Sequence, residues 1–215
     1  MRRAYLIILT IIFASFALAF YFNYFYYPPL PDVLPSHWNV AGQVDGYMSR
    51  FWALFLMPFI SVGMFLSFLL IPKIDPKRAN IAKFREYFDN FIVLIITFLF
   101  YLYLLTLAWD LNFRFDMIQF LSPGFAILFY YAGVLIEHSK QNWFIGIRTP
   151  WTLSSEKVWL KTHWLGGKLF KICGVLSLFG IIFPTIAIIF VLVPILATTV
   201  GVFAYSYFLY QKISK

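Results

Sequence analysis

Between residues 28 and 50, Asp32, His37 and Asp45 carry the imidazole and carboxylate groups that proteins use to bind divalent metals. Their spacing matches no established metal site, and no cysteine or second histidine lies nearby. In the alternative interpretation, His37 and Asn39 hydrogen-bond the backbone of the loop, as short polar side chains commonly do in turns. We favour this alternative, and we expect the chain to hold no metal or other cofactor.

A second group of chemically capable side chains, Arg148, Glu156 and His163, lies between residues 137 and 171. Glu156 and His163 are about two helical turns apart, so they could share one helix face beside a lipid phosphate. No nucleophile with an evident general base accompanies them. An enzyme acting on lipid or peptide at the membrane surface is therefore an alternative and not our preferred hypothesis.

Long apolar stretches must position both groups, because the sequence is 62% hydrophobic and only 12% charged. Soluble domains carry about 25% charged residues, and one modest core could not bury this much apolar surface. A helix of about 20 apolar residues spans a bilayer core of about 30 Å. Five uncharged stretches reach that length, namely 4–27, 51–71, 90–109, 117–136 and 172–211.

The last stretch is long enough for two spans, and Pro184 and Pro194 interrupt it. Because proline breaks the hydrogen-bond ladder of a helix, we expect a tight turn at 184–188 and six spans in total. One long helix would instead give five spans.

Arg2 and Arg3 before the first stretch also fit a signal peptide, but the apolar run continues without a polar break, so we expect a retained span.

The basic residues indicate how these spans are oriented. With six spans and an inner N-terminus, only Arg50 and Arg114 of the 17 Lys and Arg residues face outward, which fits the positive-inside rule. The sequence therefore predicts an all-α polytopic bundle in the cell membrane, with both termini in the cytoplasm. The net charge of +8 does not indicate direct contact with nucleic acid, because the basic residues lie between apolar runs; anionic lipid of the bilayer is the expected partner.

The chain divides into two parts on this interpretation. Residues 1–89 hold the first two spans, a structured outer loop at 28–50 and a basic inner loop at 72–89. Residues 90–215 form a core with four spans and an inner loop at 137–171. The outer loop and the second inner loop are too long to be simple connections, so we place function there.

Within the second inner loop, Thr152 or Ser154 could cap a short helix lying in the membrane interface, with Lys157 and Lys161 among the lipid headgroups. Such a helix would serve as a lipid anchor with Arg148 on a phosphate. The alternative is a docking surface for a cytoplasmic protein.

No charged residue or histidine lies at the centre of a predicted span, which argues against the remaining alternative, a small transporter. Two pairs of small residues, Gly63 with Ser67 and Ala197 with Gly201, have the spacing that lets helix backbones approach closely. We expect these residues to serve helix packing.

The inner loop resembles the signature of the SdpI family of bacterial and archaeal membrane proteins. The matching residues are Asn142, Gly146, Ile147, Arg148, Thr149, Pro150, Trp151, Thr152, Ser155, Glu156, Val158, Trp159, Thr162, His163, Gly166 and Gly167. The outer loop resembles a domain of unknown function that often precedes this core. Its matching residues are Leu30, Pro31, Pro35, His37, Trp38, Asn39, Gly42 and Asp45, and 71–77 with Asn80 look like its continuation.

This resemblance implies six membrane helices and immunity against a secreted peptide toxin that attacks membranes, sometimes with signalling to a cytoplasmic repressor. The candidate residues for toxin recognition on the outer loop are Asp32, His37, Trp38, Asn39 and Asp45. The candidate residues of the inner signature are Asn142, Arg148, Thr149, Pro150, Trp151, Glu156, Trp159 and His163. A receptor-like immunity protein that is not an enzyme is our preferred hypothesis.

Overall fold

Long apolar helices account for most of the computed structural model, which describes residues 2–214 and the side chains from residue 3 onward. Within this described range, six helices are long and apolar enough to cross a membrane, which confirms the predicted all-α polytopic bundle. Met1 and Lys215 lie outside the described residues, so the inner position predicted for Lys215 is not addressed.

The six spans match the predicted stretches and differ mainly at their ends. They are α1 (Arg2–Phe20) with a π-helical turn (Tyr21–Phe25), α2 (Arg50–Ile74), α4 (Arg85–Asp110), α5 (Met117–His138), α7 (Glu156–Ser177) followed by α8 (Phe179–Ile182), and α9 (Ala187–Ser214). Two short helices, α3 (Arg78–Ala82) and α6 (Pro150–Ser154), lie in the connections. The expected break is confirmed, because a 3₁₀ turn at Pro184–Ile186 separates α8 from α9.

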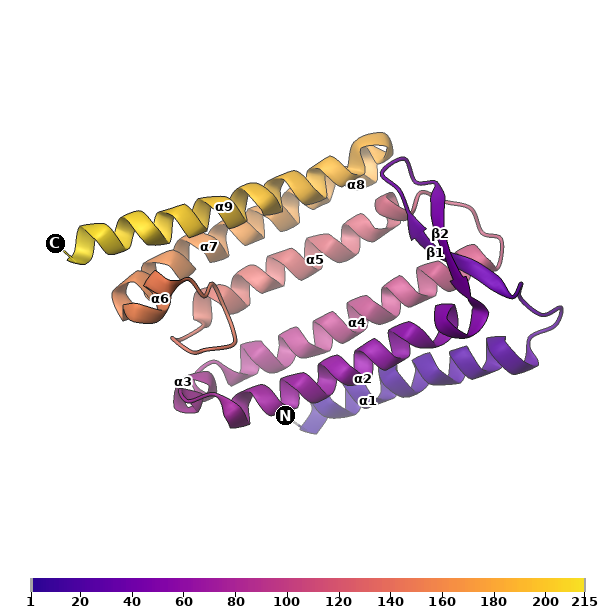
Figure 1. Ribbon diagram of the computed structural model, residues 1–215, viewed down its shortest axis with the longest axis horizontal. Coiled ribbons are helices and arrows are strands. Elements are labelled where there is room, and N and C mark those ends of the chain that lie inside the picture. The colour runs from indigo at the N-terminus through magenta and orange to yellow at the C-terminus, as the bar shows by residue number, and fades with distance from the viewer. Residues whose placement is uncertain (1, 215) are drawn as a thin grey trace.

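The helices lie side by side in a flattened row, in which α9, α7, α5 and α4 follow one another and α4 packs against both α1 and α2 (Figure 1). A pair of strands covers one end of this row, which we call the hairpin end. The opposite end, which we call the signature end, carries α3, α6 and the segment 139–155, together with both ends of the described chain. The division between residues 89 and 90 stays a prediction, since α4 contacts helices on both sides.

The start of the fifth span differs from the prediction. The chain is already helical from Glu156, so α7 begins 16 positions before the expected Ile172, and Lys157 and Lys161 belong to this long helix and not to a separate short one. Val158, Trp159 and His163 do share one side of this helix, but they are at most 1% exposed. This side is buried against the protein and is not available to lipid, because the segment 139–155 folds over it.

The outer loop is also more regular than expected, since it contains an antiparallel hairpin of β1 (Val33–Trp38) and β2 (Val44–Ser49). The turn predicted after Asn39 is present. The Ala41 and Gln43 N–H groups donate to Asn39 Oδ1 at 2.9 and 3.0 Å, so the Asn39 side chain holds the turn from within. The favoured interpretation, in which loop side chains hydrogen-bond the loop backbone, is therefore confirmed for Asn39.

Close helix contact occurs at other glycines than the ones predicted. A Cβ atom at Gly63 or Gly201 would meet nothing within 4 Å, so these positions do not bring helices together. Instead, α5 and α7 approach through Gly133 and Gly167, where a Cβ on Gly167 would lie 2.7 Å from the Gly133 carbonyl oxygen. The spacing pattern failed because it does not say which side of a helix faces a neighbour.

Candidate functional site

The outward face of the hairpin carries exposed polar and aromatic side chains. His37 on β1 is paired with Gly46 of β2, and His37 Nδ1 is 2.5 Å from Oδ1 of the adjacent Asp45. Their side chains are 69% and 44% exposed. Val33 and Tyr47 are also exposed on this face. His37 therefore pairs with a neighbouring carboxylate and does not hydrogen-bond the loop backbone as expected.

Asp32 lies apart from this pair and fixes the base of the hairpin to α2. Its carboxylate is 3.3 Å from Arg50 Nη2, and Arg50 Nη1 donates to the Leu30 carbonyl oxygen at 2.6 Å. The hairpin thus does not assemble Asp32, His37 and Asp45 into one three-ligand site. Across residues 2–214, no three His, Cys, Asp or Glu side chains are grouped as a metal site would require.

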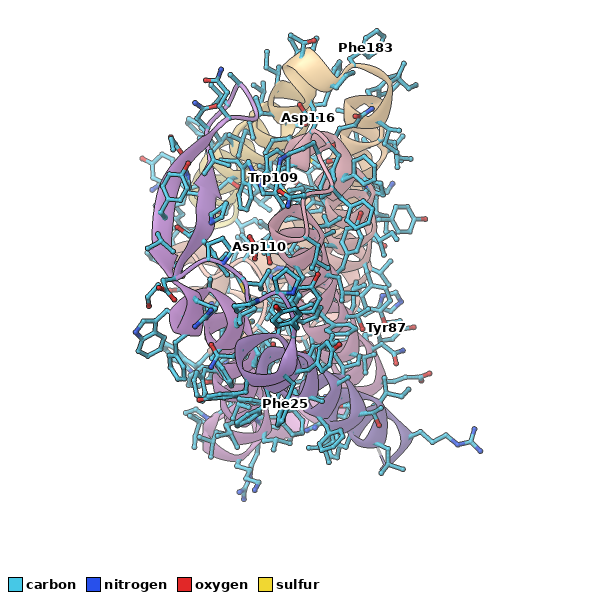
Figure 2. All side chains as sticks on the ribbon, turned by 90° about the vertical axis from the view of Figure 1, so that its right-hand side faces the viewer. Phe25, Tyr87, Trp109, Asp110, Asp116 and Phe183 are labelled. Atoms are coloured by element: carbon cyan, nitrogen blue, oxygen red, sulfur yellow. The ribbon has the colours of Figure 1, made fainter. Side chains whose placement is uncertain are left out.

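Trp38 faces the helices and packs between the hairpin and α4. Its ring meets Trp109 of α4 edge to face, with 5.7 Å between centroids, and the Arg114 guanidinium lies 4.8 Å above Trp109. Figure 2 shows Trp109 and Asp110 between the strands and the helices. In the described chain, Trp38 Nε1 and Asp110 Oδ1 are buried without a hydrogen-bond partner. Trp38 and Asn39 therefore position the hairpin, whereas His37 and Asp45 present its outer surface.

At the signature end, Asn142 organises the loop around itself. It is 0% exposed, and its amide nitrogen donates to the carbonyl oxygens of Lys140 and Ile145, both at 2.8 Å. Its amide oxygen accepts from the N–H groups of Phe144 and Ile145 at 2.9 and 2.6 Å. All four hydrogen-bonding sites of the side chain are used, which indicates a structural role.

His163 connects the same loop to α7. Its Nδ1 lies 2.8 Å from the Trp159 carbonyl oxygen, and its Nε2 accepts from the Ile147 N–H at 2.9 Å. These partners require the neutral ring with its proton on Nδ1, because a carbonyl only accepts and an N–H only donates. The His163 ring stacks on Trp159 at 3.9 Å, and Trp159 Nε1 donates to the Ser139 carbonyl oxygen.

Thr149 and Thr152 tie the loop to the last helix. Thr149 caps α6. The Thr149 hydroxyl accepts from the Thr152 N–H, and the Thr152 hydroxyl accepts from the Thr149 N–H. Thr149 Oγ1 also lies 3.0 Å from Ser206 Oγ on α9. Trp151 packs edge to face on two aromatic rings of α9, with centroids 5.1 Å from Phe203. Residues 139–155, which we call the signature segment, therefore pack against both α7 and α9 and hold the two helices together.

The basic inner loop docks on this segment, a contact that the sequence did not predict. The buried carboxylate of Asp75 accepts from the Trp143 N–H at 2.9 Å and from the Lys77 N–H at 2.6 Å. Asn80 donates to the Gln141 carbonyl oxygen at 2.8 Å. The resemblance of 71–80 to a known domain indicated that these residues matter, but it gave no partner for them.

Only part of the predicted inner signature is accessible. Arg148, Pro150 and Glu156 are exposed, and Trp143 and Phe144 beside them are 48% and 37% exposed. Glu156 is at the exposed start of α7, whereas His163 is buried with both ring nitrogens engaged. The arrangement therefore does not place Arg148, Glu156 and His163 around one phosphate.

Comparison with known protein families agrees with this architecture. Residues 139–206 match the SdpI/YfhL protein family, and residues 6–62 match a domain of unknown function, DUF1648. The first match runs from the signature loop to Ser206 of α9. The second covers α1, the hairpin and half of α2, and it stops before 71–80. These matches confirm the predicted resemblance to the SdpI family, and together with the six apolar helices they support a multi-pass protein of the cell membrane.

One curated relative aligns along most of the chain. Immunity protein SdpI of Bacillus subtilis (strain 168) is 28% identical over 202 residues, which are 92% of this chain and 93% of that protein. No solved structure matches the chain significantly.

Proposed function

We propose that this chain is a membrane immunity protein that protects the cell carrying it against a secreted, membrane-active peptide. The observation that carries the proposal is the similarity to immunity protein SdpI along 92% of the chain. The similarity includes both the hairpin end and the signature end, so it is not limited to a shared set of apolar helices.

The outward face of the hairpin is the proposed recognition surface. His37 and Asp45 offer an exposed polar pair, and Tyr47 and Val33 beside them are 63% and 56% exposed. A membrane-active peptide carries both charged and apolar side chains, and aromatic residues next to a polar pair bind such surfaces well. Asp32, Trp38 and Asn39 act in the proposal by holding this face in place.

The proposed orientation places the hairpin end outside the cell. The hairpin end carries Arg50 and Arg114, and most other lysines and arginines lie in the connections or at the helix ends of the signature end. Lys168 and Lys171 are exceptions, because α7 starts at Glu156 and places both inside the fifth span. This distribution favours a cytoplasmic signature end and cytoplasmic termini. A peptide arriving from outside then meets the hairpin first.

Signalling to a cytoplasmic repressor is the second part of the proposal. Arg148, Trp143 and Phe144 form the accessible surface at the signature end, and a guanidinium beside aromatic rings is typical of protein docking sites. The buried residues of the signature keep this surface rigid. A peptide bound at the hairpin shifts this surface only if it prefers one arrangement of the helices.

A survival assay tests the proposal. The chain is expressed in a sensitive bacterium and challenged with secreted membrane-permeabilising peptides encoded beside related genes. We expect the parent to protect, and we expect the double variant His37→Ala, Asp45→Ala to lose most of the protection while reaching the membrane at the same level. Gln43→Ala, which changes the turn outside this face, is the matched control and should protect like the parent. Equal protection by the double variant would refute the assigned surface.

A further inference from the structure

A groove lined by lysines runs between α7 and α9 at the signature end. Its volume is about 590 Å³, and it is lined by Lys157 and Lys161 from α7 and by Lys212, Tyr205 and Phe208 from α9, among others. The groove is separate from the surface formed by Arg148, Trp143 and Phe144, and it lies at the end of the bundle opposite the hairpin.

The three ammonium groups in this groove have no counter-charge from the described residues. Lys157 and Lys161 are one helical turn apart on α7 and repel each other, and Lys212 adds a third charge from α9. Among residues 3–214, no carboxylate approaches any of the three within 4.0 Å, although Glu156 is next to Lys157 in the sequence. An anion in the groove would therefore stabilise this end of the bundle.

The groove changes from charged to apolar along α9. Lys212 lies near the end of the helix, Phe208 follows about one turn further into the bundle, and Tyr205 follows about another turn in. Phe208 is 68% exposed. A second hollow of about 400 Å³ adjoins the groove, because it shares Lys161 and Tyr205 and is lined further by Leu160 and Trp164. A negative headgroup at the lysines thus leaves room for acyl chains beside aromatic and apolar side chains.

An aromatic–cation pair marks the depth of these hollows in the bilayer. Trp164 is 58% exposed, and Lys168 Nζ lies 3.6 Å above its ring. Indole rings favour the headgroup region of a bilayer, and lysine side chains near helix ends, here Lys157 on α7 and Lys212 on α9, extend toward it. The groove is therefore at the level where lipid phosphates lie.

From the charge, the shape and the depth, we infer that the groove between α7 and α9 is a binding site for an anionic glycerophospholipid. The phosphate is held by Lys157, Lys161 and Lys212, and the acyl chains lie along Phe208 and into the hollow beside Trp164. Basic grooves between membrane helices recognise such headgroups in general. This inference does not depend on the proposed immunity function.

Native mass spectrometry of the full chain tests the inference. The protein is released from nanodiscs that contain equal amounts of phosphatidylcholine and phosphatidylglycerol, and the retained lipids are counted. We expect the parent to retain phosphatidylglycerol preferentially, and we expect the triple variant Lys157→Gln, Lys161→Gln, Lys212→Gln to retain at least roughly tenfold less of it. The variant Lys73→Gln, Lys83→Gln, Lys140→Gln loses the same charge outside the groove and should behave like the parent.

The control and a soluble competitor separate the outcomes. Equal loss in both triple variants would mean that net charge alone attracts lipid, and this would overturn the groove assignment. Displacement of phosphatidylglycerol by millimolar glycerol 1-phosphate would show a site for soluble phosphates and would overturn the lipid assignment. No preference for phosphatidylglycerol in the parent would overturn both the groove assignment and the lipid assignment.

Discussion

Asn142, Thr149 and His163 direct their polar atoms at neighbouring backbone and side-chain groups and have little capacity left for a ligand. Such satisfied, buried polar residues stabilise one arrangement of a loop, and losing one partner leaves another group unpaired. The sequence could identify these residues through the family resemblance. It could not separate them from the exposed Arg148, because burial depends on how the segment 139–155 folds over α7.

The first prediction concerns His163. His163→Phe keeps the ring stacked on Trp159 but removes the acceptor for the Ile147 N–H, so we expect the variant to be less stable by about 1–3 kcal/mol. Thermal unfolding of the purified protein in detergent measures this loss. His37→Ala removes an exposed histidine and should unfold close to the parent temperature. If His163→Phe also unfolds at the parent temperature, the hydrogen bond to Ile147 does not stabilise the loop.

Sequence patterns located only some of the positions at which the elements of the bundle contact each other. The lengths of the apolar stretches and Pro184 were sufficient to predict six spans, because these features depend on bilayer thickness and backbone chemistry. The hairpin of β1 and β2 was missed, since proline-rich loop residues gave no strand pattern. The start of α7 was missed as well, because its buried polar residues look like a loop until the segment that covers them is known.

The close contact between α5 and α7 gives the second prediction. Gly167→Ala would place a methyl group 2.7 Å from the Gly133 carbonyl oxygen, so we expect a loss of about 1–3 kcal/mol as the helices move apart. Gly201→Ala meets no neighbour and should leave stability unchanged or raise it slightly, since alanine favours helix. Urea or thermal unfolding of the two variants in the same detergent compares them directly. Equal effects would contradict the assigned packing.

The contact between the basic inner loop and the signature segment gives the third prediction. Asp75→Asn replaces one carboxylate oxygen with an amide that cannot accept the hydrogen bond, so either Trp143 or Lys77 loses its partner. We expect faster hydrogen exchange at 141–144, by roughly tenfold for each 1.4 kcal/mol of lost stability. Asp32→Asn at the hairpin end is the control and should leave this segment protected. Unchanged exchange in Asp75→Asn would show that the loop docks without this carboxylate.

On the scale of the whole molecule, the flattened row of helices separates a polar hairpin face from a basic end. The proposed function needs these two ends on opposite sides of the membrane, with α4 and its neighbours joining them (Figure 1). Charge asymmetry allowed this orientation to be predicted from the sequence. The pairing of the inner loops could not be predicted, because it brings together residues that are 61 and 68 positions apart.

Cysteine labelling on intact cells provides the fourth prediction. In a Cys173→Ser background, which replaces the thiol beside Thr198 with a hydroxyl, a membrane-impermeant maleimide should label Tyr47→Cys and Phe113→Cys. It should label Lys83→Cys and Lys157→Cys only after the cells are opened. Labelling of the two lysine positions from opposite sides would refute the six-span orientation.

The most direct test of the account is photo-cross-linking between the hairpin and the peptide it is proposed to meet. A benzophenone amino acid replaces Tyr47, which is 63% exposed on the outward face, or Trp143, which is 48% exposed at the signature end. In cells that the chain protects, we expect the challenging peptide to cross-link at Tyr47 and not at Trp143. Protection without any cross-link at Tyr47, or cross-linking at Trp143 alone, would contradict recognition by the hairpin.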